Sequence, residues 1–396
     1  MKNNNFKIDA IILCGGYGTR IRKYTKNKIP KSLIKIKKKF FLDYLLKKIS
    51  IYPLNKIIIV AGFKGKKIFK EYNKKKINLI DIECIVEKKP KGTGAALNFI
   101  KRKIVNDFVL FNGDTFTNCA IEKFFKKTLN KKFIGKIILT KNSSKSLTKN
   151  LLNLNINKKK EIYFSKKSPL INSGTIFFKK NIKKFLTKNI TSLENDVLKK
   201  LITKKRITGE IDNGFFVDIG TEKNLNYAIK MLPKIFYKPA LFLDRDGVIN
   251  KDFGHVHTIK KLSYNKKIFS IICNFQKKNY FIFIVTNQAG IAKGFYNLKE
   301  FIEFQKHIKK DLLKKNIYIN DIEFCPHHPE AIIKKYKINC NCRKPKNGMI
   351  KNLKKKWHID LNKSVFIGDK KTDYLCAKSL HIKFQYFNEI KNNPIN

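Results

Sequence analysis

The sequence predicts an α/β protein built from two doubly wound units, in each of which strands alternate with helices around a sheet buried on both faces. Three observations lead to this prediction. Short apolar runs alternate with stretches of helical periodicity, the alternation restarts near residue 235, and several runs end in glycine or aspartate. With 396 residues, 43% of them hydrophobic, the chain is long and apolar enough to give two units a buried core each.

Short apolar runs mark the expected strands of the first unit. They occupy residues 8–13, 56–60, 108–111, 136–140 and 175–178. Residues 41–51 have the spacing of a helix. Residues 142–160 are rich in Lys, Asn and Ser, and we expect mostly exposed loop with short strands there.

Two prolines, Pro233 and Pro239, separate this pattern from a second one. Strands of the second unit are expected at residues 240–243, 281–285 and 364–367. The prediction is therefore a first domain at residues 1–232, a linker at 233–239 and a second domain at 240–396. Ligands of open α/β sheets bind beyond the carboxyl ends of the strands, so the glycines and aspartates at these ends are candidate site residues.

The chain is strongly basic, with 87 Lys+Arg against 29 Asp+Glu and a net charge of +58. Only six of the cations are Arg, and Lys, Asn and Ile are the residues that A/T-only codons favour. The charge is therefore interpreted as compositional drift on solvated faces, with nucleic-acid binding as the alternative. No zinc-finger spacing, basic region with heptads or RNP-type motif directs the charge at bases. What the charge predicts is attraction of anionic small molecules.

No apolar run approaches the twenty residues of a membrane span, and the apolar run near the N-terminus is too short for a signal core. A soluble, cytoplasmic protein without a membrane partner is therefore expected. Eight cysteines in 396 residues do not indicate a disulfide scaffold. The sequence does not indicate an oligomeric state.

A glycine-rich turn follows the first predicted strand directly. It reads Gly-Gly-Tyr-Gly-Thr-Arg over residues 15–20, and Pro30-Lys31 follows nine residues later. Such a turn lets backbone N–H groups contact phosphate oxygens, and Arg20 and Lys31 can neutralise the remaining charge. The turn lacks the Gly-Lys-Ser/Thr ending of a Walker loop. It predicts a phosphate site of another kind.

This segment resembles the sugar nucleotidyltransferase family, whose signature G-x-G-T-R, nine residues, P-K is present at residues 16–31. Similar motifs follow in the family's order across about residues 8–230, namely the base loop at 91–96, the metal-binding strand end at 112–114, the sugar-contacting strand at 171–174, and the segments 192–194 and 217–221. The resemblance implies a Rossmann-like nucleotidyltransferase fold and a Mg²⁺ ion held by Asp114 and Asp218. It implies Arg20 and Lys31 as catalytic cations. The implied substrate contacts are Gly15, Gly16, Gly18, Thr19, Gly92, Thr93, Gly94, Lys167, Asn172, Gly174 and Glu194.

The reaction implied is attack of a sugar 1-phosphate oxygen on the α-phosphorus of a nucleoside triphosphate, with pyrophosphate leaving. Such a step needs no protein nucleophile. It needs in-line positioning and cations that hold the charge.

Two carboxylates, Asp244 and Asp246, stand two residues apart at the end of a predicted strand in the second unit. One could attack phosphorus while the other donates a proton to the leaving group. A lone D-x-D is more often a surface turn. Three later segments favour chemistry, since residues 286–288, 343–345 and 368–373 supply a hydroxyl, cations and further carboxylates.

This order resembles the haloacid-dehalogenase superfamily, and within it the branch of histidinol phosphatases and heptose 1,7-bisphosphate phosphatases, over residues 240–385. The resemblance implies a nucleophile at Asp244, a general acid and base at Asp246, and phosphoryl stabilisation by Thr286 and Lys344. The implied magnesium ligands and their support are Asp244, the backbone carbonyl of Asp246, Asp369 and, behind them, Asp373. The implied substrate contacts are Asp252, Gly254, His255, Asn287, Gln288, Arg343 and Lys370.

Cys325, His327 or His328, Cys340 and Cys342 form a C-x-H and C-x-C set. Three thiolates and one imidazole complete a closed tetrahedral zinc site, which predicts a structural Zn²⁺. The spacing leaves both histidines open, and the resemblance selects His327.

Two enzymes on one chain imply a shared pathway. Removal of the C7 phosphate from a manno-heptose 1,7-bisphosphate gives a sugar 1-phosphate, which the first unit could join to a nucleotide, and that unit resembles the heptose 1-phosphate guanylyltransferases. The prediction is a bifunctional enzyme of nucleotide-activated heptose synthesis that uses Mg²⁺ and GTP. Two alternatives stay open: a second unit acting on histidinol phosphate, and a nucleic-acid-binding protein on decayed enzyme domains.

Overall fold

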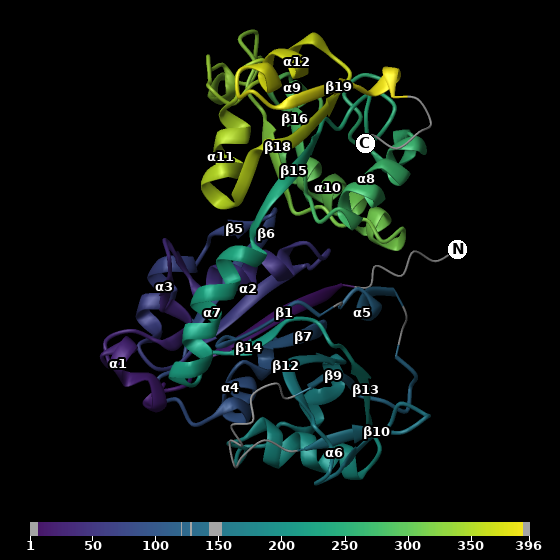
Figure 1. The fold of residues 1–396 in the computed structure, drawn as a ribbon. Coiled ribbons are helices and arrows are strands. Elements are labelled where there is room, and N and C mark those ends of the chain that lie inside the picture. The colour runs from purple at the N-terminus through teal and green to yellow at the C-terminus, as the bar shows by residue number, and fades with distance from the viewer. Residues whose placement is uncertain (1–6, 120, 127–128, 142–152, 391–396) are drawn as a thin grey trace. The chain divides into compact units, whose positions relative to one another are not determined.

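The computed structural model describes residues 7–119, 121–126, 129–141 and 153–390 (Figure 1). The chain forms two compact units: residues 1–49 with 54–232, and residues 50–53 with 233–396. Residues 142–152 of the predicted loop at 142–160 lie outside the described residues, and the remainder contains the short strand β10 (Leu154–Ile156).

The first unit is organised around β1 (Ile8–Cys14), whose seven residues are all buried. It lies between two parallel neighbours, β7 (Asp107–Asn112) and β4 (Lys56–Ala61). Within the described residues the sheet runs in the order β11, β10, β12, β7, β1, β4, β6, β5, with β9 between β12 and β13. The remaining strands of this sheet are β5 (Lys76–Ile77), β6 (Ile80–Val86), β9 (Gly135–Lys141), β11 (Ile162–Phe164), β12 (Leu170–Phe178) and β13 (Ile207–Ile211).

Two small pairs, β2 (Lys35–Ile36) with β3 (Lys39–Phe40) and β8 (Thr115–Thr117) with β14 (Phe216–Asp218), complete the strands described for this unit. Its helices are α1 (Arg22–Thr25), α2 (Phe41–Ser50), α3 (Gly65–Tyr72), α4 (Thr93–Phe99), α5 (Lys123–Lys126), α6 (Lys199–Thr203) and α7 (Glu222–Ile235). The strands and the helix predicted in this unit are confirmed to within one residue at their ends, except that β12 begins five residues before the predicted strand at 175–178.

The second unit has a five-stranded parallel sheet in the order β17, β16, β15, β18, β19. The strands are β15 (Tyr237–Leu243), β16 (Phe281–Asn287), β17 (Asp321–Cys325), β18 (His358–Gly368) and β19 (Lys383–Tyr386). The helices are α8 (Lys267–Lys277), α9 (Ala289–Ala292), α10 (Leu298–Lys314), α11 (Gly348–Lys356) and α12 (Lys371–Lys378). Figure 1 shows α11 on one side of this sheet and α8 with α10 on the other, as in a doubly wound fold.

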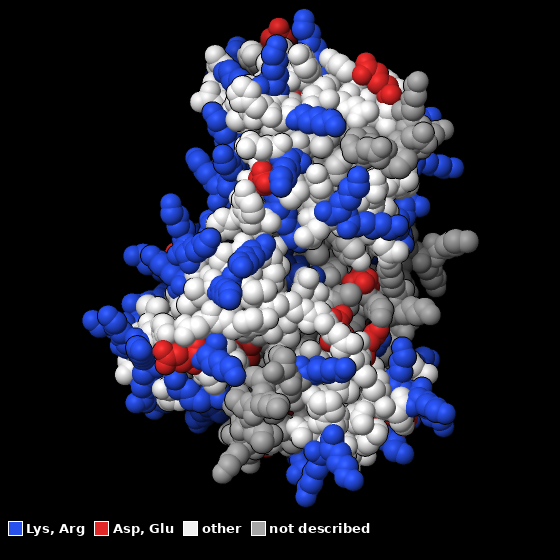
Figure 2. Space-filling view, in the orientation of Figure 1, with Lys and Arg blue, Asp and Glu red and all other residues white. Residues whose placement is uncertain are grey.

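Residues 233–239, the predicted linker, belong to the end of α7 and the start of β15. Each unit is thus an α/β fold with its strands buried by helices, as predicted. Lys and Arg side chains are spread over the whole face visible in Figure 2 and do not gather in one stripe. No helix in the described part of the chain combines the length and the apolar character that crossing a bilayer requires.

Candidate active sites and metal centre

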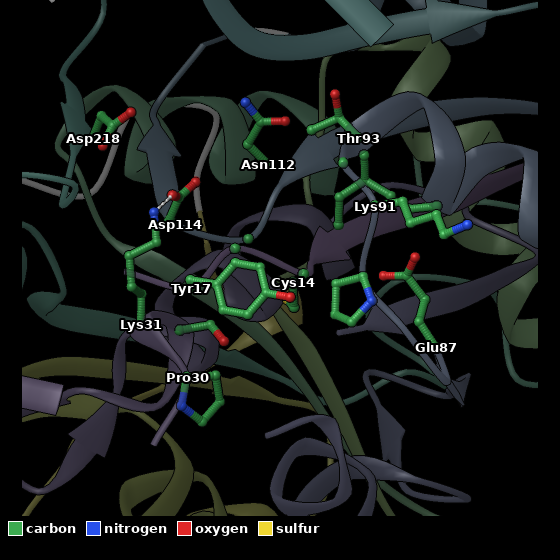
Figure 3. Close-up of a pocket in the computed structure, with 18 residues that line it drawn as sticks. Cys14, Tyr17, Pro30, Lys31, Glu87, Lys91, Thr93, Asn112, Asp114 and Asp218 are labelled. Atoms are coloured by element: carbon green, nitrogen blue, oxygen red, sulfur yellow. Dashed lines mark hydrogen bonds and ion pairs between the residues drawn. The ribbon is translucent and has the colours of Figure 1, made fainter. Parts of the chain in front are cut away.

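The first candidate site lies where β1 and β7 end side by side. Gly113 donates its backbone N–H to the carbonyl of Leu13 at 2.8 Å, so the residues that follow both strands reach the same edge of the sheet. A cavity of about 580 Å³ opens there (Figure 3). Predicted site residues in its walls are Gly15, Gly16, Lys31, Gly92, Thr93, Asp114 and Asp218.

The glycine-rich turn is built around a left-handed residue. Gly18 has φ +67°, and a Cβ atom there would lie 2.7 Å from Cγ of Lys31. Any other residue would therefore strain the turn and displace the lysine. Thr19 begins the short 3₁₀ turn that follows, and the guanidinium of Arg20 reaches Gly220, beside Asp218.

Charges of both signs meet at one side of this cavity. Lys31 forms an ion pair with Asp114. Burial lowers the pKa of Lys31, but the Asp114 carboxylate raises it by more, so the amine stays a cation. Burial, followed by the negative charge of Asp114, raises the pKa of Asp218 to about 6. Two carboxylates in the wall of one cavity are a donor set that suits a hard cation such as Mg²⁺.

Other predicted contacts lie behind the cavity wall. The hydroxyl of Thr93 donates to Glu194 and accepts the backbone N–H of Leu193, both at 2.9 Å. A Cβ on Gly174 would lie 3.0 Å from the amide of Asn112, which does line the cavity. Among the described residues, those predicted for this site that are not in the cavity wall are Gly18, Thr19, Arg20, Gly94, Lys167, Asn172, Gly174 and Glu194.

Glu87 is a cavity residue that the sequence analysis does not identify. It follows β6, its backbone N–H donates to the carbonyl of Ala61 at 2.9 Å, and the residue is only 7% exposed. Burial raises the pKa of its carboxyl. Within the described chain no group donates a hydrogen bond to this carboxylate, which lines the cavity beside Pro90 and Lys91. The only sequence signal is its position five residues before Gly92.

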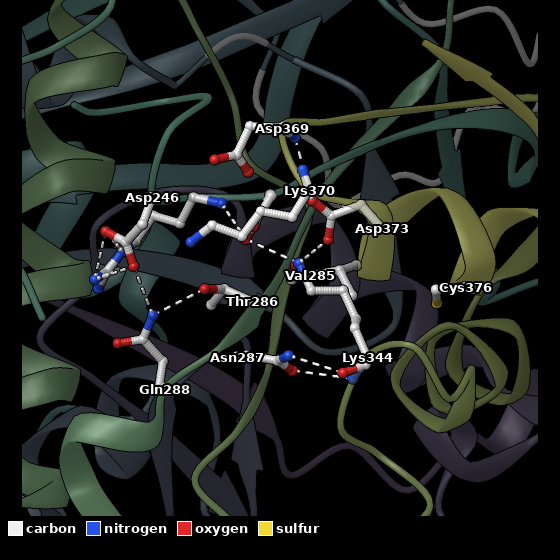
Figure 4. A network of polar contacts seen from close by, with 12 residues as sticks. Asp246, Val285, Thr286, Asn287, Gln288, Lys344, Asp369, Lys370, Asp373 and Cys376 are labelled. Carbon is white, nitrogen blue, oxygen red and sulfur yellow. Dashed lines mark hydrogen bonds and ion pairs between the residues drawn. The ribbon is translucent and has the colours of Figure 1, made fainter. Parts of the chain in front are cut away.

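The second candidate site lies at the carboxyl ends of the three central strands of the other unit. Asp244 follows β15, Asp369 follows β18, and Thr286 is near the end of β16. Figure 4 shows Thr286 and Asp369 among the polar side chains of this site. Because β15 pairs with both β16 and β18 in parallel, these side chains reach one edge of the sheet. The structure thus brings together residues that are more than 120 positions apart in the sequence.

Lys344 connects the carboxylates of this site. Its Nζ lies 2.9 Å from Oδ1 of Asp244 and 2.6 Å from Oδ1 of Asp373, and it donates to the carbonyl of Val285 at 2.9 Å. Burial lowers the pKa of Lys344, but Asp244 and Asp373 raise it above its usual value. Burial raises the pKa of Asp244 to about 7, against the opposing charge of Lys344. The buried cation therefore keeps a negative charge on Asp244 accessible near neutral pH.

The residues present fit a divalent cation. One oxygen from each of Asp244, Asp369 and Asp373 lies within 4.8 Å of the others, and Oδ1 of Asp369 is buried without a hydrogen-bond partner. Gly247 has φ +89°, and a Cβ atom on it would lie 2.1 Å from the carboxylate of Asp369. The absence of a side chain at Gly247 therefore leaves room for that carboxylate. Asp373 already accepts the backbone N–H groups of Asp369 and Lys370 at 3.2 and 3.1 Å. Asp373 therefore holds the Asp369 loop, while Asp244 and Asp369 keep free oxygens for a metal.

Asp246 is held by Arg245, which the sequence analysis does not single out. The Arg245 side chain is fully buried, and its Nε and Nη2 donate to the Asp246 carboxylate at 2.7–3.0 Å. The same Nη2 donates to the carbonyl of Val256 at 2.7 Å, and the guanidinium lies over the rings of Phe301 and Phe304. A bidentate pair of this kind fixes the plane of a carboxylate.

The amides of Asn287 and Gln288, predicted as substrate contacts, form hydrogen bonds to other groups of the site. Asn287 accepts the backbone N–H of Lys344 at 3.0 Å and donates to its carbonyl at 3.1 Å. Gln288 donates to Asp246 at 3.0 Å and to the hydroxyl of Thr286 at 2.8 Å. Both side chains position other members of the site, and the proton of the Thr286 hydroxyl stays available for a ligand.

The remaining predicted contacts also bind protein groups. Lys370 pairs with Asp252 at 3.0 Å, and the backbone N–H of Gly254 donates to the same aspartate. The ring of His255 packs on Phe295 with centroids 4.8 Å apart. Arg343 donates to the carbonyl of His327 at 3.3 Å.

The predicted metal ligands converge. The sulfurs of Cys325, Cys340 and Cys342 are 3.1–3.5 Å from one another, and Nδ1 of His327 lies 3.7 Å from Cys325 and 3.3 Å from Cys342. An ideal tetrahedron with Zn–S bonds of about 2.3 Å has edges of about 3.8 Å, close to this spacing. Of the two histidines, His327 lies in this cluster, whereas Nδ1 of His328 accepts the backbone N–H of Glu330.

Comparison with known proteins assigns both units to enzyme families. A family model described as nucleotidyl transferase matches residues 9–150, and one described as polynucleotide kinase 3 phosphatase matches residues 245–389. Over 132 residues the chain is 42% identical to a D-glycero-alpha-D-manno-heptose-1,7-bisphosphate 7-phosphatase of Photorhabdus laumondii, covering 33% of this chain and 72% of that protein. Over 142 residues it is 39% identical to a D-glycero-beta-D-manno-heptose-1,7-bisphosphate 7-phosphatase of Vibrio cholerae, covering 36% of this chain and 76% of that protein.

Among solved structures, HddC from Yersinia pseudotuberculosis is similar to 56% of this chain and 98% of its own, with 26% identity and a TM-score of 0.48. The sequence matches carry the assignment. The chain belongs to the family of heptose-1,7-bisphosphate 7-phosphatases through its second unit, which is fused to a first unit of the nucleotidyl transferase family.

Proposed function

We propose that the chain hydrolyses the C7 phosphate of D-glycero-D-manno-heptose 1,7-bisphosphate and then joins the resulting heptose 1-phosphate to a nucleotide from GTP. The observation that carries the first half is the set formed by Asp244, Lys344 and the Arg245-held Asp246 at the end of β15. The product of the first reaction is the acceptor of the second. We further propose residues 1–232 and 240–396 as the two domains, a cytoplasmic location, and use of the product in surface glycans such as lipopolysaccharide.

The phosphatase reaction takes two steps. A carboxylate oxygen of Asp244 attacks the C7 phosphorus, the bond between phosphorus and the sugar oxygen breaks, and Asp246 gives its proton to that oxygen. Asp246 then takes a proton from water, whose oxygen attacks the phosphoaspartate, so that inorganic phosphate leaves and Asp244 is restored. Lys344 and the Thr286 hydroxyl hold the charge of the transferring group.

Mg²⁺ held by Asp244, the Asp246 carbonyl and Asp369 would supply electrostatic stabilisation of the phosphoryl oxygens. The Cys325, His327, Cys340 and Cys342 cluster has no position left for a substrate, which supports a structural Zn²⁺. Asp252, His255, Arg343 and Lys370 are proposed to contact the sugar.

In the first unit an oxygen of heptose 1-phosphate attacks the α-phosphorus of GTP, and pyrophosphate leaves. The glycine-rich turn and Lys31 hold the phosphates, and Asp114 and Asp218 would hold Mg²⁺ between them. Arg20, beside Asp218, adds a second cation. Gly92 and Thr93 border the base, while Asn172, Gly174 and Lys167 are proposed to meet the sugar.

Glu87 supports GTP as the nucleotide. An ionised carboxylate only accepts hydrogen bonds. Guanine is the base whose Watson–Crick edge offers two adjacent donors, N1–H and the N2 amino group, whereas adenine and cytosine place an acceptor beside their donor. A buried carboxylate without a donor in the cavity that holds Gly92 and Thr93 therefore favours guanine.

Replacing Glu87 by Gln is expected to lower kcat/KM for GTP by about 10²-fold, because one of two charge-assisted hydrogen bonds is lost and the new amide donor faces a donor of guanine. The measurement is pyrophosphate release with each nucleoside triphosphate in turn. Glu83→Gln on β6, whose carboxylate pairs with Lys103 and Lys56 outside the cavity, is the control. Unchanged selectivity in Glu87→Gln would contradict the assignment of GTP.

One incubation tests the whole proposal. The chain is mixed with heptose 1,7-bisphosphate, as either anomer, and each nucleoside triphosphate, and the product mass is measured. The expected product is a GDP-heptose. A parallel assay of phosphate release compares histidinol phosphate with heptose 1,7-bisphosphate, and a clear preference for histidinol phosphate would overturn the choice of substrate.

A further inference from the structure

The first unit has a second cavity of about 600 Å³. It shares Glu87 and Lys91 with the nucleotide cavity, so a single segment of chain borders both. Its other walls come from α4 and from residues 188–191. The two cavities therefore lie next to each other and have one cation in common.

Lysines dominate this cavity. Lys88, Lys89, Lys91 and Lys188 line it, against the single carboxylate of Glu87. Within the described part of the chain none of the four pairs with a carboxylate, in contrast to Lys31 in the first cavity. Lysine is abundant everywhere on this protein, so its presence alone identifies nothing. Several unpaired ammonium groups around a concavity, however, focus a positive potential on an anion inside it.

The same walls offer surfaces for a base. The ring of Phe99, at the end of α4, is 51% exposed and lines the cavity. Exposed aromatic rings stack on nucleobases without a sequence requirement. Asn98 and Asn189 add amides that can donate and accept. Cations for phosphates together with an aromatic face match a nucleoside phosphate better than an inorganic anion.

The second cavity is joined to the base loop of the first by hydrogen bonds. The carbonyl of Thr191 accepts the backbone N–H groups of Gly94 and Ala95 at 2.9 and 3.3 Å. Leu193, two residues further, donates its N–H to the hydroxyl of Thr93, which lines the nucleotide cavity. A ligand held by residues 188–191 therefore contacts the segment that positions the base loop.

We propose that this second cavity binds a second nucleoside phosphate and that its occupancy weakens nucleotide binding in the first cavity. A phosphate in the second cavity draws Lys91 away from the first cavity, and a ligand on residues 188–191 disturbs the Thr191 carbonyl that holds the base loop. The coupling is reciprocal, since each ligand weakens the other by the same factor. The proposal rests on the proposed function only for the identity of the ligand in the first cavity.

The test is calorimetric titration of the full chain with a GTP analogue carrying an α,β-methylene bridge, which cannot transfer its nucleotidyl group. Two sites are expected. In Lys88→Glu/Lys188→Glu the weaker site is lost, with its Kd raised at least about tenfold, while the other keeps its affinity. The control is Lys204→Glu/Lys223→Glu, which makes the same change of charge elsewhere on the first unit.

Two further measurements separate the outcomes. GTP in excess is expected to inhibit nucleotidyl transfer by the unchanged chain and not by Lys88→Glu/Lys188→Glu. Tripolyphosphate carries the charge without the base, so it is expected to bind the second cavity less tightly than the analogue, and Phe99→Ala is expected to remove that difference. A single site in the unchanged chain, or inhibition that persists in the double variant, would overturn this proposal. No binding of the analogue at all would instead overturn the proposed function of the first cavity.

Discussion

Replacing Asp244 by Asn is expected to lower phosphate release from heptose 1,7-bisphosphate by at least about 10³-fold, because an amide cannot form the phosphoaspartate. The amide oxygen can still accept a hydrogen bond from Lys344, and Asp373 remains paired with that lysine, so the fold of the site is kept. The measurement is steady-state phosphate release, with the unfolding temperature as a check on folding.

The same variant is expected to transfer nucleotide to supplied heptose 1-phosphate within about twofold of the unchanged rate, because the two sites lie in separate units. Asp311→Asn is the control, since that carboxylate lies on α10 and pairs with Lys314 near the surface. Loss of nucleotidyl transfer in Asp244→Asn would show that the two sites are not independent. Retained phosphate release would remove Asp244 from its proposed role.

Replacing Cys340 by Ser is expected to remove the bound metal, lower the unfolding temperature of the second unit and reduce phosphate release by about 10²-fold. Cys342 is followed directly by Arg343 and Lys344, so the cluster of Cys325, His327, Cys340 and Cys342 is expected to fix the position of the Lys344 side chain. Without the metal, three sulfurs within 3.5 Å lose their common partner, and the segment that carries Lys344 loosens.

The measurements are zinc content by mass spectrometry, thermal unfolding and phosphate release. Cys273→Ser serves as the control, because that half-buried thiol lies on α8 outside the cluster. Nucleotidyl transfer is expected to be unchanged in both variants. Full phosphate release by a metal-free Cys340→Ser protein would refute the connection between cluster and site.

The apolar runs of the sequence predicted the central strands because those strands are buried on both faces. β1 and β15 are examples, and their carboxyl ends bear the predicted motifs. β6 was not predicted, since Asp81 and Glu83 interrupt its run, although its other residues pack inward. Strands near the border of a sheet need only one apolar face and therefore give a weaker signal.

Within the sites, the residues that belong to motifs could be predicted from the sequence, whereas the residues that position them could not. Arg245 stands inside the D-x-D motif, but only the structure shows both of its partners, the Asp246 carboxylate and the distant Val256 carbonyl. Glu87 is in no motif, and only the structure shows that it lines the nucleotide cavity. Contacts between residues far apart in sequence depend on tertiary packing, which spacing does not encode.

The chain has only six arginines among its 87 Lys+Arg. The buried guanidinium of Arg245 is one position at which lysine cannot take the place of arginine. The planar guanidinium of Arg245 donates to three oxygen atoms, two on Asp246 and one on Val256. A lysine ammonium is a point charge that cannot span them and would leave part of the pocket unsatisfied. Even the conservative exchange Arg245→Lys would thus remove the two-point hold on the Asp246 carboxylate and leave it to the amides of Asn250 and Gln288. The overall abundance of lysine in a protein therefore does not predict which arginines it can lose.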